Sequence, residues 1–169
     1  FLWFGKPGSP DMRKKIGSLL ETPNFYHYLS AVNNLRITQS ISGRGNVRDI
    51  DEVLQKVSLM ERKKSRFSTY SLGMKQRLAI ASALMGSPRV LVLDEPTNGL
   101  DPVGIAEIRE LILELHKKGY TIIMASHLLD EVEKICTHVA ILKKGELVTH
   151  GSVEDVLVNE DIIEISAPD

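Results

Sequence analysis

The sequence has a single cysteine, almost no net charge and no long apolar run, and each of these shortages excludes a class of protein. Cys136 cannot form an internal disulfide, which is typical of a protein from a reducing, cytosolic compartment. The formal net charge is −1, so there is no basic field to hold a nucleic acid, and we expect no such partner. Apolar runs such as Val90–Leu93 fall far short of the roughly 18 residues that cross a bilayer.

What the sequence does contain is the composition of a globular protein. Its 169 residues are 43% hydrophobic and 25% charged, which suits a single domain and excludes disordered and collagen-like chains. The first residue is Phe1 rather than Met, and the apolar segment Phe1–Phe4 predicts a strand that begins abruptly before the turn-rich Gly5–Pro10. We therefore expect that an upstream portion is missing.

The first half of the chain combines a strand with a helical region. Ile16–Leu20 is a short candidate strand, and Phe25–Ser87 contains several stretches with helical spacing. The basic run Arg62–Arg66 is interpreted as a solvated face or turn rather than a binding site. One helix face is predicted from apolar residues at i, i+3, i+4 and i+7: Ile50, Val53, Leu54 and Val57.

The second half alternates strands and helices. Val90–Leu93 predicts a strand buried on both faces, and Asp101 is the expected N-cap of a helix that continues to Lys118. Thr121–Ala125 predicts the next buried strand, parallel to the first. Further predicted elements are a helix over Leu128–Cys136, strands over His138–Leu142 and Leu147–His150, a last helix with a capping box at Ser152 and Asp155, and a strand over Ile162–Ile165.

Two consecutive carboxylates end the first of these strands. Open α/β sheets bind ligands at the carboxyl ends of their parallel strands, which is where Asp94 and Glu95 fall. Asp94 could hold Mg²⁺ directly or through water, and Glu95 could polarise an attacking water. The alternative is that both residues merely begin a solvated turn.

Three other residues point to the same region. His127 follows the strand Thr121–Ala125, which places its imidazole on the sheet edge that carries the carboxylates, although a lone histidine is more often structural. Ser71 is a good N-cap for an apolar helix, and the positive end of that helix suits a phosphate, although most capped helices bind nothing. Glu21 follows the strand Ile16–Leu20.

Taken in order, these motifs resemble those of the ATP-binding subunit of ABC transporters. Tyr70–Met74 is similar to the signature motif, Val90–Asp94 with Glu95 to the Walker B strand, and His127 to the switch histidine. Gly99, Leu100 and Asp101 are similar to the D-loop.

Two departures from the family pattern indicate which type of subunit within the family this sequence resembles. Ser71-Leu72-Gly73-Met74 replaces the common Ser-Gly-Gly-Gln, and Glu21 stands where a glutamine usually does. Both variants resemble the bacitracin- and lantibiotic-export type of bacterial subunit.

The resemblance implies a fold and a set of roles. The fold would be α/β, a partial P-loop NTPase sheet of mostly parallel strands with a helical subdomain, divided into core strands (1–21), helical subdomain (22–87) and the rest of the core (88–169). ATP and Mg²⁺ would be the cofactors. The implied roles are Asp94 for Mg²⁺, Glu95 and His127 for catalysis, the D-loop Gly99, Leu100 and Asp101 for the dimer interface, Glu21 for coupling, and Ser71, Leu72, Gly73 and Met74 for nucleotide binding in trans.

The resemblance also implies partners and a location. They are a second ATP-binding subunit arranged head to tail and a transmembrane permease, at the cytoplasmic face of the bacterial membrane. The permease would dock near Glu21 and the aromatic residues Phe25, Tyr26 and Tyr28, which could equally be core of the helical subdomain.

One family motif is absent. No Gly-x-x-x-x-Gly-Lys-Ser/Thr loop occurs in the sequence, so we expect the chain alone to bind ATP weakly or not at all and to expose apolar sheet edges. An alternative function is a non-catalytic module that uses a nucleotide sandwich for regulation or assembly. A DNA-repair or chromosome-organising ATPase is disfavoured, because Thr22–Tyr70 spans only 49 residues and has no sustained heptads.

Overall fold

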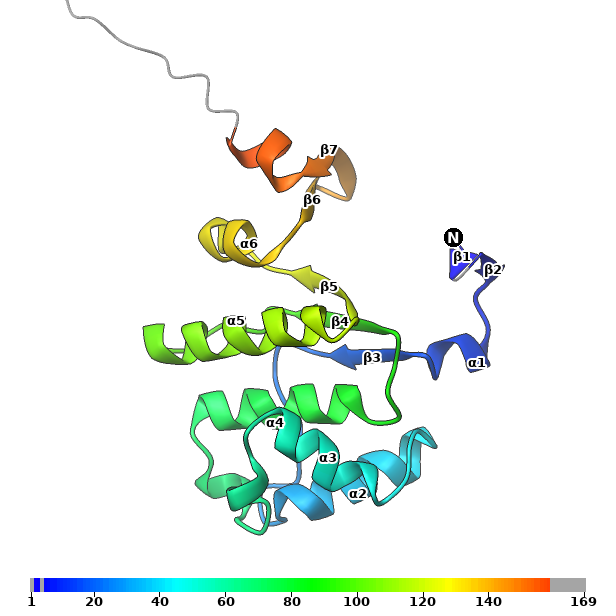
Figure 1. Ribbon diagram of the computed structural model, residues 1–169, viewed down its shortest axis with the longest axis vertical. Helices are drawn as coiled ribbons and strands as arrows, with labels where there is room; N and C mark the ends of the chain where they lie inside the picture. Colours follow the sequence, from blue (N-terminus) through cyan, green and yellow to red (C-terminus); the bar gives the residue numbers. More distant parts are fainter. Residues whose placement is uncertain (1, 4, 159–169) are drawn as a thin grey trace, which may run out of the picture. The chain divides into compact units, whose positions relative to one another are not determined.

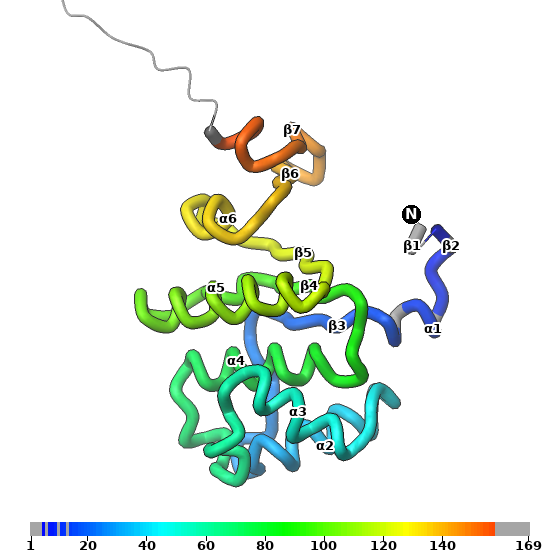
Figure 2. Tube along the Cα trace, in the orientation of Figure 1, coloured from blue at the N-terminus to red at the C-terminus, as the bar shows by residue number. Residues whose placement is uncertain are grey.

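The computed structural model describes residues 2–3 and 5–158 (Figures 1 and 2). Its contacts divide the chain into two compact units, one ending at His127 and the other beginning at Leu128. The first unit contains the parallel sheet and all of the predicted site residues. The three-part division of the chain expected above is a different one and stays a prediction.

A three-stranded parallel sheet forms the centre of the first unit. Its strands are β3 (Ile16–Leu19), β4 (Val90–Asp94) and β5 (Thr121–Ala125), in the order β3-β4-β5. The predicted strands and their parallel pairing are therefore confirmed. Leu19 is opposite Leu93, and Asp94 is opposite Ala125, so all three strands end at the same edge of the sheet.

Helix α4 (Leu72–Leu84) packs against β3 and is buried on all sides in its second half. Its consecutive residues Leu78–Ala81 are buried, as expected for a helix enclosed between a sheet and other helices. The close approach to β3 depends on Gly17, because a Cβ atom there would clash with the backbone carbonyl of Ala83. The short distance between α4 and β3 is therefore possible only because residue 17 has no side chain.

The helical part of the unit consists of α2 (Ala31–Ser42) and α3 (Asp49–Lys56), which pack together beside α4 (Figure 1). The two short 3₁₀ turns that follow are η1 (Met60–Arg62) and η2 (Phe67–Thr69). The predicted apolar face of α3 is confirmed by four buried residues, Ile50, Val53, Leu54 and Val57.

Arg44, in the loop between α2 and α3, attaches this helical part to the sheet. Its guanidinium donates hydrogen bonds to the carbonyl oxygens of Ile16 (2.7 Å) and Ser82 (3.4 Å), at the start of β3 and near the end of α4. Burial lowers the pKa of Arg44. The arginine remains a cation at physiological pH and satisfies two carbonyl groups at once.

Helix α5 (Pro102–Lys117) connects β4 to β5 as predicted. Asp101 caps it by accepting a hydrogen bond from the N–H of Gly104 (3.0 Å). Its buried stripe is Ile108, Leu111, Ile112 and Leu115. An ion pair between Arg77 and Glu107 (2.6 Å) joins α5 to α4.

The two faces of the sheet differ in burial. Gly17 and its register partner Leu91 lie on the face that α4 covers, and Leu91 is fully buried. Val92 and Ile123 lie on the opposite face, and Ile123 keeps 50% of its surface exposed. The prediction that Thr121–Ala125 is a buried strand is wrong. In the described part of the chain β5 pairs only with β4, so it is a sheet edge with alternately exposed residues.

The segment before β3 forms a small hairpin and one short helix. β1 (Leu2–Trp3) pairs antiparallel with β2 (Lys6–Pro7), where the sequence predicted only a turn after the strand. Gly5, with φ of 74°, makes the tight connection. Phe1 and Phe4, the ends of the predicted strand, lie outside the described residues. α1 (Pro10–Arg13) follows, with Ser9 as its N-cap.

The second unit contains the predicted helix and hairpin. They are α6 (Leu129–Ile135) and the antiparallel pair β6 (His138–Lys143) and β7 (Glu146–Ser152). The hydroxyl of Ser152 caps the π-helical turn η3 (Glu154–Val158), accepting a hydrogen bond from the N–H of Asp155 (3.1 Å). The predicted strand over 162–165 lies outside the described residues.

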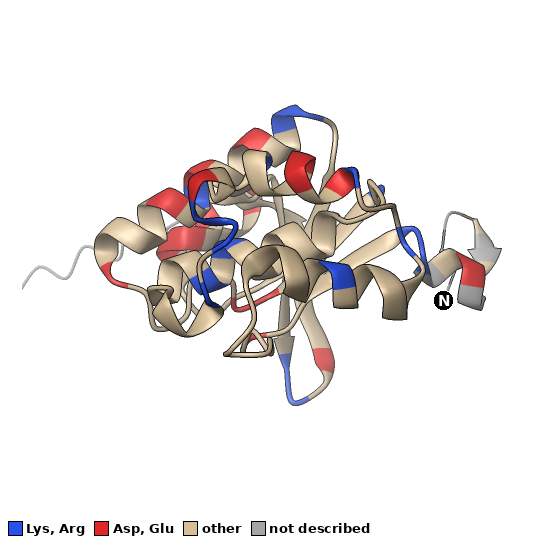
Figure 3. Cartoon of the chain, turned by 90° about the horizontal axis from the view of Figure 1, so that it is seen from below, with Lys and Arg blue, Asp and Glu red and all other residues tan. Residues whose placement is uncertain are grey.

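Charged residues of both signs are interspersed along the surface helices (Figure 3). This distribution agrees with the net charge of −1. None of the described helices is long and apolar enough to span a membrane.

We predict that Gly17→Ala destabilises the protein, because its methyl group meets the carbonyl of Ala83. The expected loss is about 1–3 kcal/mol in the free energy of unfolding, measured by urea denaturation. Gly73→Ala is the matched control, since a Cβ at Gly73 meets nothing within 4 Å. The control should be neutral or slightly stabilising, and equal effects of the two substitutions would contradict the packing argument.

Candidate functional site

The three parallel strands bring the predicted residues to one edge of the sheet. Asp94 ends β4 and Glu95 follows it, His127 lies two residues after β5, and Glu21 lies two residues after β3. The structure thus joins parts of the chain that are more than 100 residues apart in sequence.

The closest pair at this edge is Glu95 and His127. Glu95 Oε2 and His127 Nδ1 are 2.9 Å apart. The glutamate side chain is 21% exposed and the histidine side chain 62%. When the carboxylate is ionised it accepts from Nδ1–H, and this favours the tautomer whose Nε2 can accept a hydrogen bond.

Glu95 has an unusual backbone conformation. Its φ is 46°, in the left-handed region that residues other than glycine rarely occupy. Its N–H donates to the carbonyl of Ala125 (3.0 Å), and its own carbonyl accepts from the N–H of Asn98 (3.1 Å). Ser58, Ser87 and Lys144 also have positive φ, but Glu95 is the one of these residues that lies at the sheet edge beside His127, where its strained backbone is held by these two hydrogen bonds.

Asp94 is exposed at the end of β4. Among residues 2–3 and 5–158 no group of three or more His, Cys, Asp or Glu residues could hold a metal ion. Mg²⁺ does not need such a cage, because it is usually held by one or two carboxylates with water and substrate phosphates. A single exposed carboxylate at this position fits a phosphate-bound Mg²⁺.

Asn98 is a residue of the site that the sequence did not reveal. Its side-chain amide donates a hydrogen bond to Glu21 Oε1 at 2.7 Å, across 77 residues of sequence. The signal that could have found it is its position three residues after Glu95, in the turn that carries the acidic pair to Asp101. Only the fold shows that the loop after β3 lies beside this turn.

The signature-like segment begins next to the same turn. A Cβ atom on Gly99 (φ 73°) would lie 3.4 Å from Leu72 Cδ2, so the first turn of α4 neighbours the turn after Glu95. Ser71 is exposed and caps α4 by accepting a hydrogen bond from the N–H of Met74 (3.2 Å), as predicted. No hydrogen bond or ion pair in the described part of the chain joins Ser71–Met74 to Glu95 or His127.

Tyr70 and Asp101, at the two ends of these motifs, have structural contacts. The Tyr70 hydroxyl donates to the carbonyl of Arg62 (2.8 Å), and burial raises the pKa of Tyr70. The Asp101 carboxylate caps α5. Both residues fix the backbone next to a predicted functional segment.

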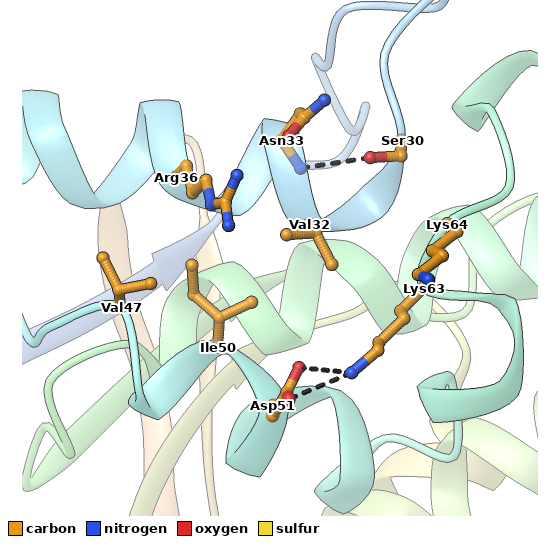
Figure 4. Close-up of a pocket in the computed structure, with 9 residues that line it drawn as sticks. All are labelled: Ser30, Val32, Asn33, Arg36, Val47, Ile50, Asp51, Lys63 and Lys64. Atoms are coloured by element: carbon orange, nitrogen blue, oxygen red, sulfur yellow. Dashed lines mark hydrogen bonds and ion pairs between the residues drawn. The ribbon is translucent and has the colours of Figure 1, made fainter.

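The helical part also contains cavities whose lining does not include the predicted catalytic residues. One, of about 450 Å³, lies between α2, α3 and the 63–64 turn (Figure 4), and there both carboxylate oxygens of Asp51 accept from Lys63 at 3.0 Å. Another, of about 510 Å³, is lined by Phe25, Tyr26 and residues of α2. Tyr26 is 49% exposed there, so the aromatic residues after Glu21 are partly surface residues.

The fold and the site define a class of protein. A parallel α/β sheet with a carboxylate pair and an imidazole at its carboxyl edge is typical of α/β proteins that bind a ligand at that edge. The family model described as ABC transporter matches residues 4–98, more than half of the chain. The chain belongs to the ABC transporter family.

Within this family, the chain is similar to ATP-binding proteins named for the transport of bacitracin and lantibiotics. The bacitracin transport ATP-binding protein BcrA of Enterococcus faecalis is 43% identical over 84% of this chain and 46% of that protein. The lantibiotic transport ATP-binding protein SrtF of Streptococcus pyogenes is 43% identical over 80% of this chain and 58% of that protein. The chain thus spans about half the length of the curated relatives it matches.

A solved structure confirms the fold class. The chain aligns with cbiO1 of Clostridium perfringens, part of the ABC transporter complex cbiONQ, with a TM-score of 0.83 and 30% identity. The alignment covers 95% of this chain and 68% of cbiO1. The predicted α/β fold of an ABC ATPase is therefore confirmed.

We predict that the strain at Glu95 is measurable. Glu95→Gly and Glu95→Ala both remove the carboxylate that pairs with His127, but only glycine adopts the left-handed conformation without steric cost. The glycine variant should be more stable than the alanine variant by about 1 kcal/mol in urea denaturation. An alanine variant that is equally stable would contradict the assigned backbone strain.

Proposed function

We propose that this chain is the catalytic half of an ATP-hydrolysing subunit that energises export through a membrane partner. The observation that carries the proposal is the 2.9 Å contact of Glu95 and His127 at the carboxyl edge of a parallel sheet. The reaction would be the hydrolysis of ATP to ADP and phosphate, and membership of the ABC transporter family supports this.

Glu95 would orient and deprotonate the attacking water. His127 occupies its Oε2, which leaves Oε1 to accept the proton from water. The strained backbone and the two main-chain hydrogen bonds keep this carboxylate at the strand end, and such positioning is the main requirement of phosphoryl transfer. With Nδ1–H donating to Glu95, His127 would contact the γ-phosphate of ATP through Nε2–H, which the ring carries as the imidazolium.

Asp94 would hold Mg²⁺ through its exposed carboxylate, directly or through water. When bound, the ion neutralises negative charge on the phosphates. The exposed start of α4 supplies a second anion site: backbone N–H groups after Ser71 carry the positive end of the helix dipole. We propose that Ser71, Leu72, Gly73 and Met74 contact the nucleotide of a second, head-to-tail subunit, and that Gly99–Asp101 order the interface between the two subunits.

ATP affinity would depend on a phosphate-binding loop supplied from outside these 169 residues. The sequence contains no Gly-x-x-x-x-Gly-Lys-Ser/Thr segment. The exposed sheet face around Ile123 supports the same proposal, because apolar sheet surface of this kind is normally covered. Both observations favour an ATPase that is completed by further protein.

The partner would be a transmembrane permease, which places the chain at the cytoplasmic face of the membrane. We propose that the permease docks near Glu21 and the aromatic residues that follow it. Phe25 and Tyr26 line the cavity of about 510 Å³, and Tyr26 and Tyr28 are 49% and 68% exposed. Partly exposed tyrosines are common in protein interfaces. The similarity to proteins named for bacitracin and lantibiotic transport favours antimicrobial-peptide export.

The 169-residue chain alone should bind Mg²⁺–ATP only weakly, because the groups that would cradle the α- and β-phosphates are absent from its sequence. Isothermal titration calorimetry measures this directly. A micromolar dissociation constant for the isolated chain would contradict this expectation.

In the complete ATPase, Glu95→Gln should reduce phosphate release at least about 100-fold, because an amide cannot accept the proton from water. Steady-state assays with saturating Mg²⁺–ATP measure the effect. Glu110→Gln, on the exposed surface of α5, is the matched control and should retain turnover. Undiminished turnover of the Glu95→Gln variant would reject Glu95 as the base, whereas a wild-type protein that binds but does not hydrolyse ATP would support the non-catalytic nucleotide-sandwich module.

A further inference from the structure

Asn98 connects two segments that the proposed reaction uses separately. Its side-chain Nδ2–H donates to Glu21 Oε1 at 2.7 Å, which is a short distance typical of hydrogen bonds to a charged acceptor. In the described residues this is the single hydrogen bond assigned to the Glu21 carboxylate. The orientation of that carboxylate therefore depends on Asn98.

Asn98 itself is held by the turn that constrains Glu95. Its backbone N–H donates to the carbonyl of Glu95 (3.1 Å), and the carbonyl of its neighbour Thr97 accepts from Leu100 (3.3 Å). Thr97 is buried, with 2% of its surface exposed. Asn98 thus belongs to the same turn as the proposed catalytic carboxylate of Glu95, and the buried Thr97 holds this turn in place.

Glu21 has no comparable anchor of its own. It is exposed, and the preceding Leu20 is 73% exposed, in the irregular segment between β3 and α2. Holding a side chain of such a segment in one rotamer costs conformational entropy. The hydrogen bond from Asn98 is the interaction that opposes this cost for Glu21.

We propose that Asn98 is a positioning residue that holds the Glu21 carboxylate at a fixed place relative to the Glu95–His127 pair. Asn98 engages one carboxylate oxygen, and Oε2 keeps its capacity to accept a further hydrogen bond. Movement of the Glu21 segment then requires the bond to Asn98 to break, which links that segment mechanically to the turn after Glu95. The inference rests on the proposed function, because it names how Glu21 is held for that reaction.

The contact can be tested without any activity. In the NMR spectrum of the 169-residue chain, Glu21→Ala should move the side-chain amide resonances of Asn98, because the acceptor is removed. The amide resonances of Asn33, an exposed asparagine on α2, should stay in place. Unchanged Asn98 resonances would overturn the proposal.

A double-mutant cycle in the complete ATPase tests the positioning role. Asn98→Asp replaces the donor by a second carboxylate beside Glu21, and we expect kcat to fall about fivefold with little change in KM. In a Glu21→Gln background the same substitution should cost less than about twofold, because the amide introduced at position 21 can donate to the new carboxylate. Asn33→Asp is the control for the added charge and should leave kcat unchanged.

The outcomes separate the two proposals. A loss from Asn98→Asp that is equal in both backgrounds, or no loss at all, would overturn the positioning role even if the wild-type enzyme hydrolyses ATP. A complete ATPase that does not hydrolyse ATP, with the Asn98 resonances still dependent on Glu21, would reject the proposed function and retain the contact.

Discussion

The parallel pairing of β4 with β3 on one side and β5 on the other is the constraint on which the site depends. Parallel neighbours end at the same edge, so residues that follow three different strands are brought together without any special contact between them. Glu21, Glu95 and His127 each follow one of these strands. A change of register by one residue would turn the side chains of β4 to the opposite face and separate Glu95 from His127.

The sheet alone does not determine the distances between the side chains of the site. The turn after β4 does so, by combining a left-handed Glu95, a hydrogen bond to the carbonyl of Ala125, and a buried Thr97. This turn also presents Asn98 to Glu21 and Gly99 to Leu72. One short segment therefore contacts the loop after β3, the strand β5 and the start of α4, which suits a segment that coordinates a proposed hydrolysis site with its surroundings.

The packing around the sheet is asymmetric. One face is closed by α4, at a distance set by Gly17, and the helical part is attached by Arg44 through two backbone carbonyls. The other face retains exposed apolar surface at Ile123. This asymmetry agrees with the proposal that nucleotide binding requires protein from outside these 169 residues, because the face that α4 leaves uncovered retains apolar surface that further protein could cover.

The sequence by itself determined the elements that local chemistry controls. The N-caps at Ser71 and Asp101, the apolar face of α3 and the strand–helix–strand order of β4, α5 and β5 follow from residue types and spacing, and all are confirmed. The candidate residues Asp94, Glu95 and His127 were also identified in the sequence, because each follows a predictable strand. Only the tertiary structure decided that β5 is an exposed edge, that Asn98 meets Glu21, and that Glu95 and His127 touch. Those features depend on neighbours distant in sequence, whose positions no local pattern encodes.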